Sequence, residues 1–213
     1  MSDPPPRRPP GVDHLAVSDP SIGALVERHG ELSAETRRRR RPPLDAFGML
    51  LRSVVGQQLS TKAAFTIHGR VLELFDGGAP TPEALLEIAP ERLREAGLSN
   101  RKVEYVRDLA SHVVAGELEL DRLESLSDEE VIEEITAVRG FGLWSAQMFL
   151  IFFLDRPDVL PSGDLGIRRA VQLAYELEQL PTPAEVERIG EPWHPHRSLA
   201  AIYLWESLAA TPA

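Results

Sequence analysis

A short turn bounded by glycines, between two helical segments, constrains this chain more than any other feature. The amphipathic segment EEVIEEIT leads into Gly140, Phe141 and Gly142, and the apolar segment LWSAQMFLIFFL follows. Glycines at both ends of so short a turn let the backbone adopt positive φ and approach another molecule closely. The second helix would present unpaired N–H groups and the positive end of its dipole at the turn. Such a turn is suited to binding a phosphate group.

Helical periodicity continues along the chain from Leu44 and predicts an all-α fold. Apolar residues spaced at i, i+3, i+4, i+7 and i+8 define one buried helical face: Phe47, Leu50, Leu51, Val54 and Val55. Helix starts are marked by Thr81 before Pro82, by Ser99, and by Ser127 with Glu130, which form a capping-box pattern. No segment shows the alternation expected of a strand.

Composition narrows the class of protein. A chain of 213 residues is long enough for one domain or two small lobes. The absence of cysteine excludes disulfides, zinc sites with thiolate ligands and iron–sulfur clusters. The net charge of −10, taken alone, argues against a nucleic-acid partner. Arginines cluster, however, from Arg37 to Arg41 and at Arg168 and Arg169, and the local field decides where DNA can dock. The run from Arg37 to Arg41 is either a solvated linker or a backbone-phosphate contact.

The N-terminal residues 1–43 are expected to form a partly disordered tail. The segment to about residue 20 is rich in proline and loosely attached, a short helix runs from Pro20 to His29, and the arginine run follows. The start MSDPPPRRPPG lacks the apolar stretch of a signal peptide, and no apolar run reaches about 18 residues. We therefore expect no membrane span and a cytoplasmic protein.

A lone carboxylate, Asp164, lies in a Pro-Ser-Gly-Asp loop directly before the helical pattern GIRRAVQLAYEL. At this place it is either an N-cap or a catalytic group. The histidines His194 and His196 lack carboxylate or cysteine support, so they do not favour a metal site.

Four ordered strings together carry a family resemblance: VVGQQLSTKAA at 54–64, the Gly140 turn, GDLGIRRA at 163–170 and WHPHRSLAAIYLW at 193–205. They cover roughly Leu44 to Leu208. The chain resembles the helix-hairpin-helix DNA glycosylase superfamily, and within it the alkylation-repair branch of the 3-methyladenine DNA glycosylase II type. It resembles the compact form, without an N-terminal β-rich domain. Arg139 departs from the family, which usually has proline before the first hairpin glycine.

The resemblance implies an all-α domain over 44–213, with two helical lobes flanking a DNA-binding cleft. It implies base excision repair of double-stranded DNA, in which the N-glycosidic bond of alkylated bases such as 3-methyladenine and 7-methylguanine is hydrolysed to leave an abasic site. Asp164 would be the catalytic residue, stabilising the positive charge that develops on the sugar. Bifunctional relatives carry a nucleophilic lysine where this chain has Trp144, so no lyase activity is expected. We expect a monomer that requires no cofactor.

The resemblance also assigns the remaining site residues. The base pocket would comprise Trp144, Trp193 and Phe47, with indole faces favouring positively charged bases. The DNA wedge would come from Gln57, Gln58, Leu59 and Ser60, with Gln58 the leading candidate. Hairpin contacts to DNA phosphate are assigned to Arg139, Gly140, Phe141 and Gly142, and a further DNA contact to Arg197. A sodium or potassium ion could bind the backbone carbonyls of Thr136, Val138 and Phe141.

Simpler interpretations of the same residues stay open. The glutamines can cap a turn, the tryptophans can pack in a core, and Arg197 can form an ion pair. At the level of function, the alternatives are a glycosylase for mismatched or deaminated bases and a non-catalytic helix-hairpin-helix DNA-binding module. A third alternative is a helical interaction protein that does not touch DNA.

Overall fold

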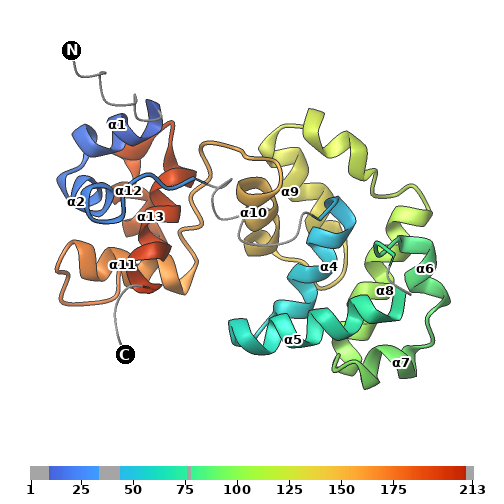
Figure 1. The fold of residues 1–213 in the computed structure, drawn as a ribbon. Helices are drawn as coiled ribbons and strands as arrows, with labels where there is room; N and C mark the ends of the chain where they lie inside the picture. Colours follow the sequence, from blue (N-terminus) through green and yellow to red (C-terminus); the bar gives the residue numbers. More distant parts are fainter. Residues whose placement is uncertain (1–9, 34–43, 76–77, 210–213) are drawn as a thin grey trace, which may run out of the picture. The chain divides into compact units, whose positions relative to one another are not determined.

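The computed structural model describes residues 10–33, 44–75 and 78–209, and every regular element within these ranges is an α-helix or a 3-10 helix (Figure 1). The all-α prediction is confirmed. The chain divides into two compact units. Unit 1 combines Met1–Pro42 with Asp155–Ala213, and unit 2 is Pro43–Leu154.

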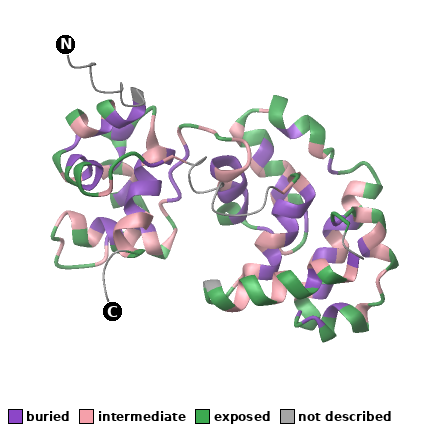
Figure 2. Ribbon diagram, in the orientation of Figure 1, coloured by how far each residue is buried: buried purple, intermediate pink, exposed green. Residues whose placement is uncertain are grey.

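Unit 1 joins the two ends of the chain. Its N-terminal helices pack on its C-terminal ones, with α2 against α13, and α1 against both α13 and η3. Its elements are α1 (Pro10–Ser18), α2 (Pro20–His29), α11 (Leu165–Ala174), α12 (Pro183–Ile189), η3 (Glu191–Trp193) and α13 (Arg197–Ala209). The buried residues of α13, Ala200 to Leu204, form the centre of this packing (Figure 2).

The N-terminal part of unit 1 differs from the sequence expectation. The helix expected from Pro20 to His29 is present as α2, and Asp19 caps it by accepting the backbone N–H groups of Ser21 and Ile22. The segment before it, expected to be loosely attached, forms α1. The physical reason is that Val12 and Leu15 lie on one face of this helix and are 1% and 0% exposed. The described part of the N-terminal segment is thus built into the same unit as the C-terminal helices.

Unit 2 contains the glycine turn. Its elements are α4 (Ala46–Gly56), α5 (Thr61–Leu72), η1 (Glu73–Phe75), α6 (Pro82–Glu87), α7 (Pro90–Glu95), α8 (Asn100–Val114), η2 (Leu120–Ser125), α9 (Asp128–Ala137) and α10 (Leu143–Phe152). Helix α4 packs against α5, α8, η2 and α10. The apolar face predicted for α4 is buried, so this helix forms the centre of the unit (Figure 2).

Local capping signals in unit 2 agree with the sequence analysis. Thr81 caps α6, Ser99 caps α8, and Ser127 with Glu130 forms the predicted capping box of α9. These caps fix where α8 and α9 begin; α9 leads into the glycine turn, and side chains of α8 contact that turn. In the described ranges, no helix combines the length and apolar character that a membrane crossing requires.

Candidate functional site

The glycine turn joins α9 to α10, and its two glycines have different roles. Gly140 has φ of +91°, whereas Gly142 is extended, with φ of −125° and ψ of 178°. A Cβ on Gly140 would lie 2.3 Å from the ring of Tyr105 on α8, while one on Gly142 would meet nothing within 4 Å. Of the two glycines, Gly140 therefore uses the positive φ that glycine permits, and Gly142 does not. Gly140 is required by backbone conformation and packing, and Gly142 leaves the start of α10 open.

The start of α10 has the form of an anion-binding helix end. Gly142 is its N-cap, and no side chain caps the helix. The Gly142 carbonyl accepts the N–H groups of Ser145 and Ala146 at 2.9 and 3.2 Å, which begins the helical hydrogen bonding. A helix end without a capping side chain can turn its first N–H groups toward an incoming phosphate. Phe141 is buried, so its ring is not presented to solvent at the turn.

Arg139, which precedes the first glycine, is held by α8. Its backbone N–H donates to Asp108 Oδ2 at 2.8 Å, and its guanidinium lies 3.1 Å from Glu104 Oε2. Both side chains of the Arg139–Glu104 pair are mostly exposed, and such pairs contribute little net stability. A DNA phosphate could therefore compete with Glu104 for this guanidinium.

The turn between α4 and α5 contains the four wedge candidates, and the structure separates them. Gln58 adopts φ of 56° and is exposed, and Leu59 is 38% exposed. Ser60 caps α5 through Oγ, which accepts the Ala63 N–H. The Gln57 side chain is directed elsewhere, because its Nε2 donates to the Gly140 carbonyl at 2.9 Å. Gln58 and Leu59 are thus the residues of this turn that project.

Lys102 of α8 supports the same turn. Its Nζ donates to the carbonyls of Val55 and Gln57, both at 2.8 Å. These carbonyls lie at the C-terminal end of α4, where helices lack internal donors. Partial burial lowers the pKa of Lys102 from its usual value.

The three base-pocket candidates occupy different environments. Trp144 is 45% exposed in the first turn of α10. Phe47 is buried in α4, and Trp193 is 0% exposed with its indole N–H donating to Asp19 Oδ2 at 2.9 Å. The assignment of Trp193 to a base pocket is therefore wrong, since its ring is enclosed by unit 1. Phe47 is likewise corrected to a core residue of unit 2, as its periodic position suggested.

Asp164 is the N-cap of α11 and is partly exposed. Its Oδ1 accepts the backbone N–H of Ile167 at 2.9 Å and the indole N–H of Trp205 at 3.0 Å. Gly166 makes this arrangement possible, because a Cβ there would lie 2.9 Å from Asp164 Oδ1 and 3.3 Å from the Trp205 ring. The carboxylate is therefore both a helix cap and an oriented, accessible group.

Trp205 is the functional candidate that sequence reasoning missed. It belongs to α13 and lies 41 residues beyond Asp164 in the chain. An apolar helical pattern surrounds it, which is typical of a core residue. The sequence does not indicate which group its indole N–H binds, because the packing of α13 against α11 brings it to the carboxylate.

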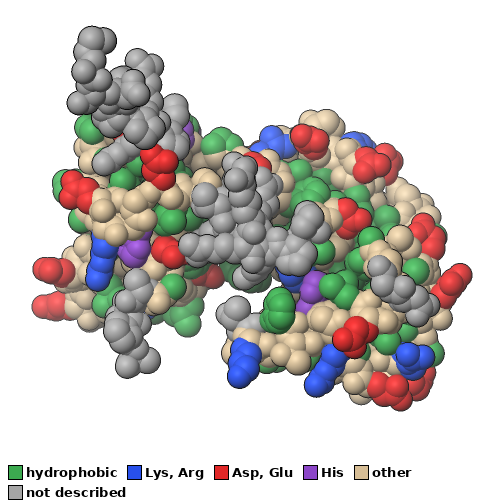
Figure 3. Space-filling view, in the orientation of Figure 1, with side chains coloured by type: hydrophobic (Ala, Val, Ile, Leu, Met, Phe, Trp, Pro, Cys, Tyr) green, Lys and Arg blue, Asp and Glu red, His purple; other side chains and the backbone are tan. Residues whose placement is uncertain are grey.

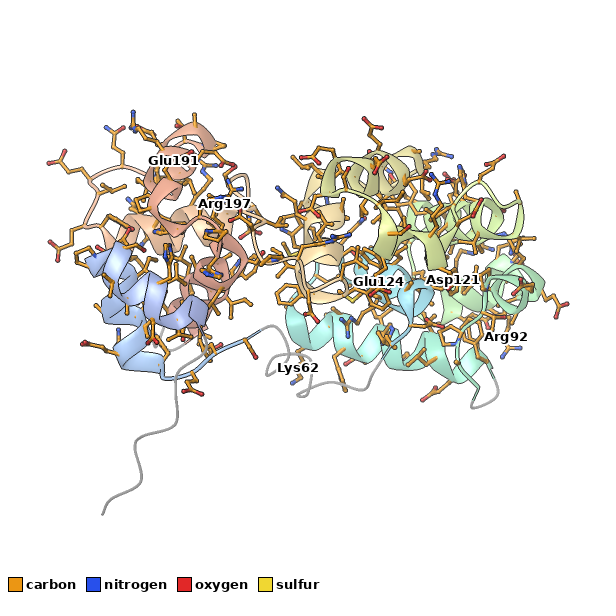
Figure 4. The ribbon with its side chains drawn as sticks, turned by 90° about the horizontal axis from the view of Figure 1, so that it is seen from above. Lys62, Arg92, Asp121, Glu124, Glu191 and Arg197 are labelled. Atoms are coloured by element: carbon orange, nitrogen blue, oxygen red, sulfur yellow. The ribbon has the colours of Figure 1, made fainter. Side chains whose placement is uncertain are left out.

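Arg197, at the start of α13, is bound within unit 1 (Figure 4). Its Nε and NH2 donate to the two carboxylate oxygens of Asp158 at 2.9 and 2.7 Å, and NH2 also donates to the Asp158 carbonyl. Burial alone would raise the pKa of the Asp158 carboxyl, but hydrogen bonds from Arg197 and His194 outweigh it and hold that pKa below its usual value. These contacts favour the ion-pair interpretation of Arg197 over a DNA contact.

Within the described ranges, no group of three or more His, Asp or Glu side chains is arranged to hold a metal. His194 pairs with Asp158, and the His196 ring packs edge-on to that of His14.

At the glycine turn, the Val138 carbonyl accepts the Phe141 N–H at 3.2 Å. The arginine run from Arg37 to Arg41 lies outside the described residues.

Comparison with known proteins places these features in a family. Residues 51–195 match the model of the HhH-GPD superfamily base excision DNA repair protein. The chain is 34% identical to DNA-3-methyladenine glycosylase 1 of Schizosaccharomyces pombe over 91% of this chain and 85% of that protein.

Solved structures agree with the sequence match. A 3-methyladenine DNA glycosylase of Schizosaccharomyces pombe in complex with abasic DNA superposes with a TM-score of 0.84 at 33% identity, over 94% of this chain and 97% of that one. A DNA-3-methyladenine glycosidase from Bacillus halodurans gives a TM-score of 0.79 at 36% identity, over 95% of this chain and 90% of that one. The turn between α9 and α10, called the hairpin below, lies within the matched residues, and this chain belongs to the HhH-GPD superfamily of base excision DNA repair proteins.

Proposed function

We propose that this chain is a monofunctional DNA glycosylase that removes alkylated purines of the 3-methyladenine and 7-methylguanine class and leaves an abasic site. The observation that carries the proposal is the partly exposed Asp164 carboxylate, oriented by the Ile167 and Trp205 N–H groups. The similar proteins of Schizosaccharomyces pombe and Bacillus halodurans, which bear 3-methyladenine glycosylase names, support the substrate class.

Asp164 would act on the sugar of an extruded nucleotide. As the base leaves, positive charge develops on the deoxyribose, and a fixed negative charge stabilises that transition state. The same carboxylate can orient or deprotonate the attacking water. Two N–H donors on Oδ1 hold the carboxylate in place without the reorganisation that a mobile side chain would need.

Hydrolysis without strand cleavage fits the residues near the hairpin. Trp144 occupies the position where bifunctional relatives carry a nucleophilic lysine. Lys102 is in the same unit, but its ammonium donates to two backbone carbonyls and supports the wedge turn. An amine held in this way is not presented to a sugar carbon.

The exposed indole of Trp144 supports the choice of substrate. Alkylated purines of this class carry positive charge, and an indole face attracts cations as well as stacking on a flat base. These bases are already good leaving groups, so little hydrogen bonding to the base is needed. The enzyme can then select damage by the weakness of the glycosidic bond.

DNA would be gripped by main-chain groups at the hairpin, with Gln58 and Leu59 filling the gap left by the extruded nucleotide. The carbonyls of Thr136, Val138 and Phe141 would offer an ion oxygen ligands alone, which suit sodium or potassium better than a transition metal. No cofactor is required for hydrolysis of this kind.

An enzyme that repairs chromosomal DNA works inside the cell, and we place this chain there. We also propose that it acts as a monomer.

A lesion-panel assay tests the proposal. The protein is incubated with duplexes carrying methylated purines, uracil or a thymine mismatch, and released bases are quantified. We expect release of 3-methyladenine and 7-methylguanine and no strand cleavage before alkali treatment. Release of uracil or thymine alone would favour the mismatch alternative, and DNA binding without any release would favour the non-catalytic module.

The role of Trp144 is tested within the same panel. Replacing Trp144→Phe keeps a stacking ring but weakens the attraction for a cation, whereas Trp144→Ala removes both. Excision of charged lesions should fall in the order wild type, Trp144→Phe, Trp144→Ala. Equal losses for a neutral lesion such as hypoxanthine would contradict the cation argument.

A further inference from the structure

We propose that Gln57 is a positioning residue that joins the wedge turn to the hairpin, so that the two DNA-gripping loops move as one body. The inference rests on the proposed function, because it assigns the hairpin to DNA phosphate and Gln58 with Leu59 to the wedge. It changes the role of Gln57 from a wedge residue to the connection between wedge and hairpin. Lys102 completes the connection from α8.

The contact between the loops is direct. Gln57 and Gly140 are 83 residues apart in the chain, and Gln57 Nε2 donates to the Gly140 carbonyl at 2.9 Å. The N–H of the same peptide group, that of Phe141, donates to the Val138 carbonyl at 3.2 Å. Because a peptide group is planar, holding its C=O and its N–H fixes its orientation. The next peptide leads to Gly142 and the open start of α10, so Gln57 helps to aim the phosphate-binding end of the hairpin.

The backbone of Gln57 is itself anchored. Its carbonyl and that of Val55 accept Lys102 Nζ, each at 2.8 Å, and its N–H donates to the Val54 carbonyl. The side chain that reaches the hairpin therefore starts from a fixed point. Gln58, the next residue, begins the projecting part of the wedge with φ of 56°.

Helix α8 supports both loops from one side. Lys102, Tyr105 and Asp108 are spaced three residues apart, so each is a neighbour of the next along the helix surface. Lys102 holds the wedge turn, the Tyr105 ring lies under Gly140, and Asp108 accepts the Arg139 N–H at 2.8 Å. The hairpin and the wedge turn thus share one support and are joined directly by Gln57.

This arrangement has a mechanical consequence. Binding energy gained where the hairpin grips a phosphate can be used to hold the wedge in the duplex, because the two loops cannot shift independently. Loss of the Gln57 amide should leave each loop folded but allow them to move separately. The wedge would then be inserted less completely even when DNA is fully bound.

The test uses Gln57→Leu, which keeps the side-chain size but has no donor, and Gln58→Leu, the matched change at the neighbouring projecting residue. Both are measured with a duplex that carries an uncleavable abasic-site analogue opposite 2-aminopurine, whose fluorescence rises when the base unstacks. At saturating protein, the wild type should give a full rise. Gln57→Leu should lose at least half of it although Gln58 is intact, and its affinity for the duplex should fall about five- to tenfold, as expected for one lost hydrogen bond.

Coupling between the loops gives a second readout that a general loss of stability would not produce. In the wild-type background, the effects of Gln58→Leu and of the hairpin change Gly142→Asp on affinity should be non-additive. In the Gln57→Leu background the two effects should become additive. Thermal unfolding confirms that each variant is folded.

The outcomes separate the inference from the proposed function. A full 2-aminopurine rise and unchanged coupling in Gln57→Leu would overturn the inference while leaving the glycosylase proposal intact. If the wild type bound abasic DNA but released no methylpurine, the proposed activity would fail, and the coupling result would still decide the role of Gln57. Failure of the wild type to bind the duplex would overturn both.

Discussion

At the scale of single residues, the carboxylate of Asp164 is defined by what donates to it. Its cap of α11 is a local interaction that any aspartate before a helix can make, and Asn would make it as well. The Trp205 indole adds a donor from a different helix on the same oxygen. The second contact distinguishes Asp164 from an ordinary N-cap such as Asp45, which accepts the Gly48 N–H at the start of its own helix.

Replacing Trp205→Phe should slow base excision about five- to tenfold, because it removes one hydrogen bond to the carboxylate and keeps an aromatic ring. Affinity for abasic DNA should change little. Single-turnover release of 7-methylguanine checks the rate. The matched control is Trp193→Phe, which removes the indole donor to Asp19 and should lower the unfolding temperature without altering excision by the folded protein. Equal rates for wild type and Trp205→Phe would remove Trp205 from the site.

Arg197→Gln and Asp158→Asn should each destabilise the fold by about 1–3 kcal/mol and should leave DNA affinity unchanged, because the two side chains form a charged hydrogen-bonded pair. The double variant should be no worse than either single one. Chemical denaturation and DNA titration measure both quantities. A loss of DNA affinity in Arg197→Gln without a loss of stability would restore Arg197 as a DNA contact.

The same pair predicts a pH dependence of stability. Since folding lowers the pKa of Asp158, its stabilising effect is complete above the unfolded value of about 3.9 and is lost as the pH falls through the lower folded value. The stability difference between wild type and Asp158→Asn should therefore be constant near neutrality and shrink below about pH 4. A difference that grew in acid would contradict this account.

At the scale of elements, the sequence predicts what is encoded locally. Helix starts at Thr81, Ser99 and Ser127, the buried face of α4, and the hairpin follow from caps, periodicity and glycine spacing. The distinct roles of Gly140 and Gly142 do not, because they depend on a tyrosine that lies on another helix. The contacts of Gln57 with Gly140 and of Trp205 with Asp164 cannot be predicted from the sequence either, because each joins residues that are far apart in the chain.

The hairpin offers a sharp test of phosphate binding. Gly142 has the extended backbone of an N-cap with open space around it, so Gly142→Asp and Gly142→Asn should both cap α10 and keep or slightly raise stability. The aspartate places a negative charge where a phosphate would bind, whereas asparagine does not. DNA affinity should fall at least tenfold more for Gly142→Asp than for Gly142→Asn. Equal affinities would show that phosphate does not bind there.

At the scale of the whole molecule, a chain with net charge −10 must bind a polyanion. Acidic side chains are spread over the visible face of each unit, and Asp121 and Glu124 lie on η2 of unit 2 (Figures 3 and 4). Two cations beside the proposed DNA-binding loops have partners in unit 2, since Lys102 donates to carbonyls and Arg139 pairs with Glu104. Main-chain N–H groups at the hairpin therefore supply much of the proposed grip.

This balance predicts a weak salt dependence of DNA binding. Each neutralised phosphate contributes a slope of about −0.9 to log K against log salt, and we expect a total slope no steeper than about −4. Titrations of an abasic-analogue duplex over a series of salt concentrations measure it. A slope of about −6 or steeper would show an extensive cationic interface, and the same titration with the arginines from Arg37 to Arg41 replaced would then test that run as its source.

The division of the chain into units could not be predicted from local patterns. The sequence correctly indicates an all-α chain. Helix α1 nevertheless resembles a proline-rich tail in the sequence, because it has few apolar residues, and Val12 and Leu15 are buried where α1 packs against α13 and η3. Unit 1 is built from both ends of the chain, and such pairing leaves no periodic signal. The family resemblance supplied the function, while the physical arrangement of Asp164 required the folded chain.

The central claim is that Asp164 performs the chemistry and does not merely cap α11. The most direct test is single-turnover release of 7-methylguanine by wild type, Asp164→Asn and the matched N-cap change Asp45→Asn, with affinity for abasic DNA measured in parallel. Asparagine preserves the cap at both positions, so all three proteins should fold and bind DNA alike. We predict that Asp164→Asn loses excision by at least about a thousandfold while Asp45→Asn retains it. Excision by Asp164→Asn at a rate near that of the wild type would contradict the account.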